Sequence, residues 1–188
     1  MLSKVVIPAE FLASLVFLPM VVFGADSKGL RPRANQTQYP VTVFNESVAV
    51  ACERASPARV RKQFGADLDA RFLVVEVGIF PKDKSTINMK PEEFVLRVKA
   101  DQTFIKPCAA KQIAAADAIV ASEVSLSNLP EGPTSKPVAG YLFFPLEQKI
   151  ENDRAYELEY KGESGWMILP LQMAPERANI KLIRSGIH

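Results

Sequence analysis

The sequence has very little of the equipment that most enzymes use. It contains one histidine, which is the final residue, His188. An interior histidine is the commonest general base and the commonest metal ligand, so its absence excludes a Ser/His/Asp hydrolase. Two cysteines and a terminal histidine match no zinc-ligand spacing, and no glycine-rich phosphate loop or dinucleotide fingerprint is present. The sequence therefore assigns no catalytic residue, no cofactor and no metal.

The chain also lacks a strong charge of either sign. Its 188 residues include 23 basic and 21 acidic side chains, mixed along the sequence, for a formal net charge of +2. Such a balance creates no field that favours nucleic acid as a partner. The hydrophobic fraction of 48% is that of an ordinary globular protein, and the length suits one domain.

The only long apolar run lies at the N-terminus. Lys4 supplies a positive start, residues 11–23 are apolar apart from Ser14, and Gly24 offers a small residue before a cleavage point. The run is shorter than the roughly 20 residues that span a bilayer, so residues 1–24 are expected to be a cleaved signal peptide, with an uncleaved anchor as the rival. The mature chain is then periplasmic or extracellular and has no stable membrane span.

Four segments are expected along the chain. Residues 1–24 form the signal peptide, residues 25–40 a flexible leader poor in apolar side chains, residues 41–175 the folded domain, and residues 176–188 a tail.

A central strand over residues 72–80 is the strongest structural signal. Leu73, Val75, Val77 and Ile79 give one continuous apolar face, and β-branched residues dominate. Shorter runs with alternating or apolar patterns predict a first strand over 41–52, broken by turn-like residues at 45–47, and further strands at 94–100, 138–144, 156–160 and 166–169. The proline-rich residues 129–137 are expected to form an exposed loop. A short helix is expected from Ser56 to Phe64 and a second over residues 109–121, where a strand that starts at Ile119 is the alternative. The fold class is therefore mainly β, an antiparallel sandwich with one or two short helical inserts, with a flattened barrel as the alternative.

This order of strands and turns resembles a known family. Residues 91–96 (Pro-Glu-Glu-Phe-Val-Leu), the turn at Asp101, residues 140–145 (Gly-Tyr-Leu-Phe-Phe-Pro) and residues 156–160 (Tyr-Glu-Leu-Glu-Tyr) carry the resemblance. The pattern is similar to the telokin-like, immunoglobulin-like extracellular domains of bacteria. The resemblance implies an immunoglobulin-like sandwich and supplies no catalytic residue.

Cys52 and Cys108 are the one pair that the sequence singles out. In an exported chain they form either a structural disulfide or two buried free thiols, and a redox pair is disfavoured because nothing activates a thiolate.

Acidic pairs and aromatic side chains are the remaining candidate functional groups. The acid pairs are Asp67 with Asp69, Glu92 with Glu93, and Glu157 with Glu159; an acid pair is what glycosidases use, but turn or solvent-facing positions are expected for all three. The aromatic candidates are Tyr141, Phe143, Phe144, Tyr156, Tyr160 and Trp166, and packing in the core is expected for them, with Trp166 as an anchor.

These observations favour a non-enzymatic binding or protein-interaction module of the cell envelope. It would act through loops or a free sheet edge, which can pair with another envelope protein without any sequence motif. The alternatives are a structural subunit of an envelope assembly and, less favoured, a hydrolase that depends on carboxylates alone.

Overall fold

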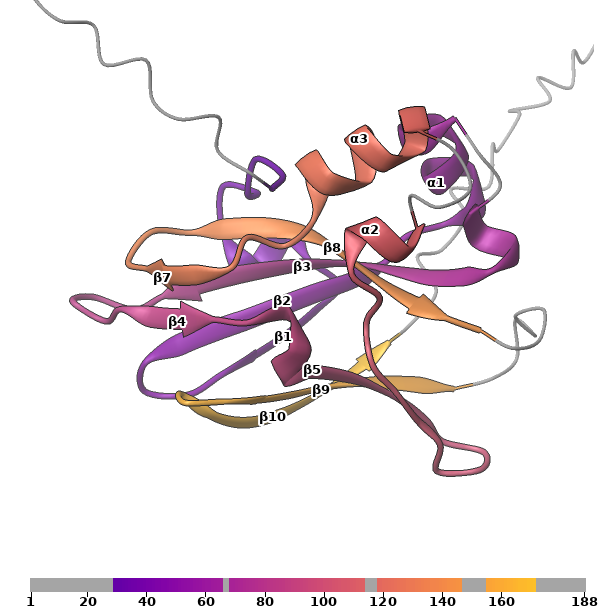
Figure 1. Ribbon diagram of the computed structural model, residues 1–188. Coiled ribbons are helices and arrows are strands. Elements are labelled where there is room, and N and C mark those ends of the chain that lie inside the picture. The colour runs from indigo at the N-terminus through magenta and orange to yellow at the C-terminus, as the bar shows by residue number, and fades with distance from the viewer. Residues whose placement is uncertain (1–28, 66–67, 114–117, 147–154, 172–188) are drawn as a thin grey trace, which may run out of the picture.

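The computed structural model describes residues 29–65, 68–113, 118–146 and 155–171, and its elements form three layers (Figure 1). The expected signal peptide (1–24) and the tail (176–188) lie outside the described residues. In Figure 1 the helices lie on one side of a first sheet, and a second sheet lies on its other side.

Ten strands make up the sheets of the described residues, and all pairs of these strands are antiparallel. The first sheet has the order β1-β2-β3-β8, with β1 at Val41–Phe44, β2 at Val48–Arg54, β3 at Phe72–Pro81 and β8 at Val138–Pro145. The second sheet has the order β10-β9-β5-β6, with β10 at Gly165–Leu171, β9 at Tyr156–Gly162, β5 at Phe94–Val98 and β6 at Phe104–Ile105. A small ribbon pairs β4 (Ile87–Met89) with β7 (Gly132–Thr134).

The helices are short. They are α1 (Pro57–Phe64), α2 (Ala110–Ile113) and α3 (Ala118–Ser127), with 3₁₀ turns at Gln36–Gln38, Leu68–Ala70 and Pro91–Glu93. The predicted start and end of α1 are confirmed: the Ser56 side chain accepts a hydrogen bond from the Arg59 N–H, and Gly65 ends the helix with a φ of 64°. The expected second helix is two helices, and the loop expected at residues 129–137 contains β7.

Strand β3 is the centre of the first sheet, as its sequence predicts. It pairs with β2 on one side and β8 on the other, and residues 72–80 are all buried. Leu73, Val75, Val77 and Ile79 face the second sheet and form the main core with Phe94, Leu96, Leu158 and Tyr160. Phe72 and Val74 face the helices and pack with Phe64, Val124 and Phe143. Because both faces of β3 are buried, its side chains are mostly apolar at odd-numbered and even-numbered positions alike.

The sequence-based prediction of a mainly β protein with antiparallel sheets and short helices is confirmed. The immunoglobulin-like connection of the strands remains a prediction. Segments expected to be one broken strand, 41–44 and 48–52, are instead two strands that pair with each other, because Asn45 caps the turn between them by accepting from the N–H groups of Ser47 and Val48.

Residues 29–40 differ from the flexible leader expected there, because they make specific contacts with the first sheet. The Leu30 N–H donates to the Ala139 carbonyl of β8 at 2.8 Å, and the Tyr39 ring is buried against Phe80 at 6.0 Å between centroids. Gly78 makes room for Tyr39, since a Cβ there would lie 2.7 Å from the Tyr39 hydroxyl. The segment has few apolar residues, so its sequence did not indicate that Leu30 and Tyr39 contact the first sheet.

Candidate functional site

Four charged side chains meet on the helix-facing side of the first sheet. Glu53 of β2 and Glu76 of β3 are register partners, so their carboxylates project side by side. Arg33 donates from Nε to Glu76 Oε1 at 3.1 Å and also pairs with Glu53. Arg59 of α1 donates to Glu53 Oε2 at 2.9 Å and pairs with Glu76. We call these four residues the ion cluster.

Glu76 is the most buried member of the ion cluster, with a side chain only 4% exposed. Burial by itself would raise the pKa of Glu76, but the hydrogen bonds and positive charges of Arg33 and Arg59 outweigh it and hold the pKa below its ordinary value. Both carboxylates of the cluster are bound to arginine. A general acid needs a raised pKa and access to substrate, and this acid pair has neither. Its role is structural, because it joins residues 29–40 and α1 to the first sheet.

The lowered pKa of Glu76 predicts acid sensitivity. A carboxylate with a folded-state pKa below its ordinary value of 4.5 stabilises the fold above that pH, and the contribution is lost as the pH falls through the folded-state pKa. Chemical denaturation at a series of pH values between about 6 and 3 should therefore show falling stability, with a shallower fall in a Glu76→Gln variant. An equally steep fall in that variant would contradict this assignment.

Of the three acid pairs that the sequence offered, two lie among the residues that the structure describes, and neither lies in a cleft. Asp67 lies outside the described residues, and the side chain of Asp69 is not described. Glu92 is exposed, while Glu93 is half-buried, and burial raises its pKa. Glu157 and Glu159 lie on the outward face of β9, as expected. Glu159 is buried, however, and not exposed to solvent as expected. Two basic side chains cover its carboxylate, with Lys161 Nζ at 2.7 Å and Arg97 Nη1 at 3.7 Å.

Cys52 and Cys108 do not form the disulfide that was one of the two expectations; both are free thiols. Cys52 is fully buried in the core between the two sheets, whereas Cys108 packs with the helix-facing cluster on the opposite side of the first sheet. A sheet lies between the two sulfur atoms, so no rotamer could join them.

The two thiols are expected to differ in reactivity. Burial raises the pKa of both, and Cys52 is fully enclosed while Cys108 is partly accessible. A thiol reagent should therefore label Cys108 first in the folded chain and both cysteines after unfolding, without prior reduction. A thiol count that rises only after a reductant is added would contradict this expectation.

Most of the aromatic candidates are core residues, as predicted. Tyr141, Phe143, Phe144, Tyr156 and Tyr160 are at most 3% exposed. Trp166 is the exception, because it is 65% exposed and not a core anchor. In β10 the residues Met167, Leu169 and Leu171 point inward, so the alternation of the strand places Trp166 on the outer face of the second sheet.

The outer face of the second sheet bears a group of exposed aromatic and charged side chains. Trp166 and Phe104, 65% and 56% exposed, lie on either side of Lys161, whose Nζ is 5.5 Å and 5.7 Å from their ring centroids. Next to them Glu157 accepts from Arg97 at 3.4 Å and lies 3.1 Å from Lys99 Nζ. We call Trp166, Lys161 and Phe104 the aromatic platform.

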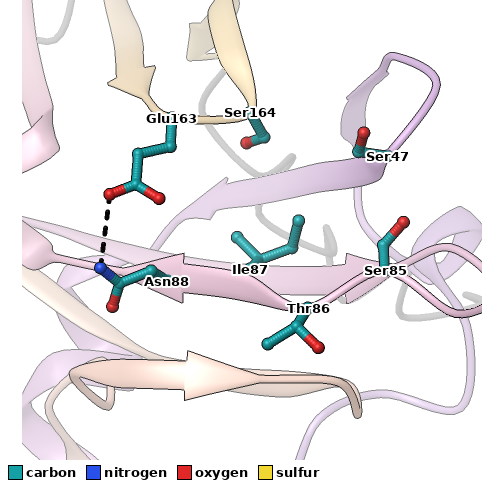
Figure 2. A pocket seen from close by; sticks show the side chains of 7 residues that line it. All are labelled: Ser47, Ser85, Thr86, Ile87, Asn88, Glu163 and Ser164. Atoms are coloured by element: carbon teal, nitrogen blue, oxygen red, sulfur yellow. Dashed lines mark hydrogen bonds between the residues drawn. The ribbon is translucent and has the colours of Figure 1, made fainter.

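A polar cavity of about 220 Å³ opens where three turns meet at one end of the sheets. Figure 2 shows Glu163 and Ser164 of the β9–β10 turn on one side, Ser47 of the β1–β2 turn on another, and the β4 strand below. Its lining consists of Ser47, Ser85, Thr86, Ile87, Asn88, Glu163 and Ser164. The sequence did not indicate this cavity, because its lining comes from separate turns with ordinary turn residues.

The described residues show neither a metal-binding cluster nor a membrane-spanning helix. They contain no group of three or more histidine, cysteine, aspartate or glutamate residues placed to hold a metal ion. Within the same residues, no helix has both the length and the apolar character needed to cross a membrane.

Comparisons with known proteins give a structural similarity and no match by sequence. No protein-family model matches the sequence, and no curated protein matches it. The fold is similar to the crystal structure of a Bacillus subtilis protein described as a putative lipoprotein, YcdA, at 18% sequence identity and a TM-score of 0.44. The match covers 70% of this chain and 38% of that one, so this chain spans well under half the length of the protein it resembles.

Proposed function

We propose that this chain is an exported binding module of the cell envelope, without enzymatic activity, that recognises another envelope protein through the outer face of its second sheet. Export rests on the N-terminal apolar run, and the module would have the immunoglobulin-like architecture that its sequence resembles. The single observation that carries the proposal is the aromatic platform, an exposed tryptophan and phenylalanine on a sheet face that no described element covers.

The two sheets differ in how much of their surface is available. Both faces of the first sheet are buried, one by the second sheet and one by the helices and residues 29–40 (Figure 1). No described element covers the outer face of the second sheet, although Glu159 on that face is buried beneath Lys161 and Arg97. The outer face therefore presents an open surface, and regular strands hold the side chains there in fixed positions.

Two of the four edges of the first and second sheets, those of β8 and β6, are poorly suited to binding by strand addition. The edge of β8 is occupied by backbone from Leu30 and Leu129, whose N–H groups donate to the carbonyls of Ala139 and Tyr141. The edge strand β6 has only two residues. Strand addition needs a row of unpaired backbone groups. The other two edge strands, β1 with four residues and β10 with seven, remain open to it, and the exposed aromatic side chains favour the face over them.

The chemistry of the platform suits a protein partner. Tryptophan and arginine are enriched among the residues that dominate binding energy at protein interfaces, and charged residues typically form the rim. Here Trp166 and Phe104 are the apolar centre. The neighbouring charges already pair with each other, as Arg97 does with Glu157, so they supply orientation more than affinity.

Crosslinking of the exported chain in envelope extracts tests the proposal when wild type is compared with surface variants. A partner captured by wild type should be lost with Trp166→Ala and with Phe104→Ala. It should be retained with Phe44→Ala, a matched control because Phe44 is 70% exposed at the end of β1, away from the platform. Capture that is unchanged in both platform variants would refute the proposed surface, and a product containing only this chain would indicate a self-assembling structural subunit instead.

A further inference from the structure

We infer that the polar cavity is a second binding site, independent of the aromatic platform, for a small neutral ligand with several hydroxyl groups, such as a single sugar unit. Its volume of about 220 Å³ has room for several water molecules. That is below the usual range for drug-sized ligands and suits one small ring.

Hydrogen bonds link the walls of the cavity to one another and to the core. The Asn45 side chain donates from Nδ2 to the Ser164 carbonyl, which joins the β1–β2 turn to the β9–β10 turn. The Ser164 hydroxyl is 3.0 Å from the Tyr160 hydroxyl, and Tyr160 is itself fully buried. The Lys82 N–H donates to the Ser47 carbonyl at 2.9 Å, which holds the third wall. A cavity with walls held in this way loses little entropy on binding.

The polar groups that face the cavity are available. Figure 2 shows Ser47 and Ser85 on one side, Glu163 on the other, and Ile87 between them, while Thr86 points away. Within the described part of the chain, the hydroxyls of Ser47 and Ser85 have no hydrogen-bond partner, and Asn88 reaches Glu163 only at 3.5 Å. Serine hydroxyls and the asparagine amide can each donate and accept, which is what the hydroxyl groups of a polyol require.

The charge at the cavity favours a neutral ligand over an ion. Glu163 is the one charged residue in the lining, and Lys90 Nζ lies 3.9 Å from its Oε1, which offsets the carboxylate. A ligand with a net charge therefore gains little from Coulomb attraction here. The carboxylate remains a strong acceptor for the hydroxyls of a neutral ligand. Ile87, only 5% exposed, supplies an apolar floor for ring carbons.

Titration of the isotopically labelled full chain by NMR tests the inference. Glucose and N-acetylglucosamine are the neutral probes, and methylammonium and inorganic phosphate are the charged ones. We expect saturable shifts at residues 47, 85–88 and 163–164 with at least one neutral probe, at a dissociation constant in roughly the millimolar range, as suits so small a ligand. Neither charged probe should saturate these residues.

Variants separate this site from a non-specific effect. Asn88→Ala and Glu163→Gln should each weaken binding about tenfold or more, while Gln63→Ala on the exposed face of α1 should leave it unchanged. Trp166→Ala should also leave sugar binding unchanged. The proposal for the cavity and the proposal for the aromatic platform can therefore be refuted independently of each other. The inference is overturned if neither sugar shifts these residues, if the shifts survive both cavity variants, or if a charged probe saturates the site instead.

Discussion

Replacing Glu76 by alanine is expected to lower the free energy of unfolding by about 3 kcal/mol. Removing one partner of a buried ion pair leaves the other charge buried and unpaired, which typically costs about 3–5 kcal/mol of stability. The lower end applies here, because Arg33 and Arg59 are 23% and 37% exposed and water can reach them in part. Denaturant unfolding of wild type and variant measures the difference.

A matched control for Glu76 lies at an exposed ion pair. Glu163 is 69% exposed and its Lys90 contact is 3.9 Å, so Glu163→Gln should change the unfolding free energy by less than about 0.5 kcal/mol. A double-mutant cycle between Glu76 and Arg33 should give a coupling of about 1 kcal/mol or more, since the two share two hydrogen bonds. Equal effects at Glu76 and Glu163 would show that the ion cluster does not tie residues 29–40 to the fold.

Replacing Phe94 by alanine is expected to cost about 3–5 kcal/mol of stability. The Phe94 side chain is fully buried at the start of β5, and its ring centroid is 4.9 Å from that of Tyr160. Removing it opens a cavity in the core between the sheets, which the neighbouring strands cannot fill without breaking their ladder. Thermal and denaturant unfolding should both show the loss.

The control for Phe94 is the exposed tryptophan of the same sheet. Trp166→Ala should change stability by less than about 1 kcal/mol, because Trp166 faces solvent. The contrast tests which face of the second sheet is buried. A severe loss in the tryptophan variant, or a mild one in the phenylalanine variant, would mean that the faces are assigned the wrong way round.

Sequence periodicity predicted the strands well because each has a buried face that repeats every second residue. Strand β3 and the β9–β10 hairpin follow this rule, and the caps of α1 follow from Ser56 and Gly65. The same rule places Trp166 on the exposed face, because Met167 and Leu169 are buried and the side chain of Trp166 points to the opposite face of the strand. The expectation failed because a large aromatic residue was assumed to be buried, although tryptophan is common at interfaces.

Long-range placement was beyond the sequence pattern. Glu76 among valines signals a buried charge that needs a partner, but nothing local identifies Arg33, 43 residues away, as that partner. Likewise, Cys52 and Cys108 could not be assigned to opposite faces of one sheet before the path of residues 104–113 was known. The cavity depends on three turns that come together only in the folded chain.

The fluorescence of Trp166 tests the central claim most directly, because it is the only tryptophan in the chain. In the free protein the account predicts the red-shifted emission of an exposed indole, readily quenched by acrylamide. Addition of the captured envelope partner should shift the emission to the blue and protect it from the quencher. Emission that is already blue-shifted and protected in the free monomer, or that does not respond to the partner, would contradict the proposal that this sheet face is a binding surface.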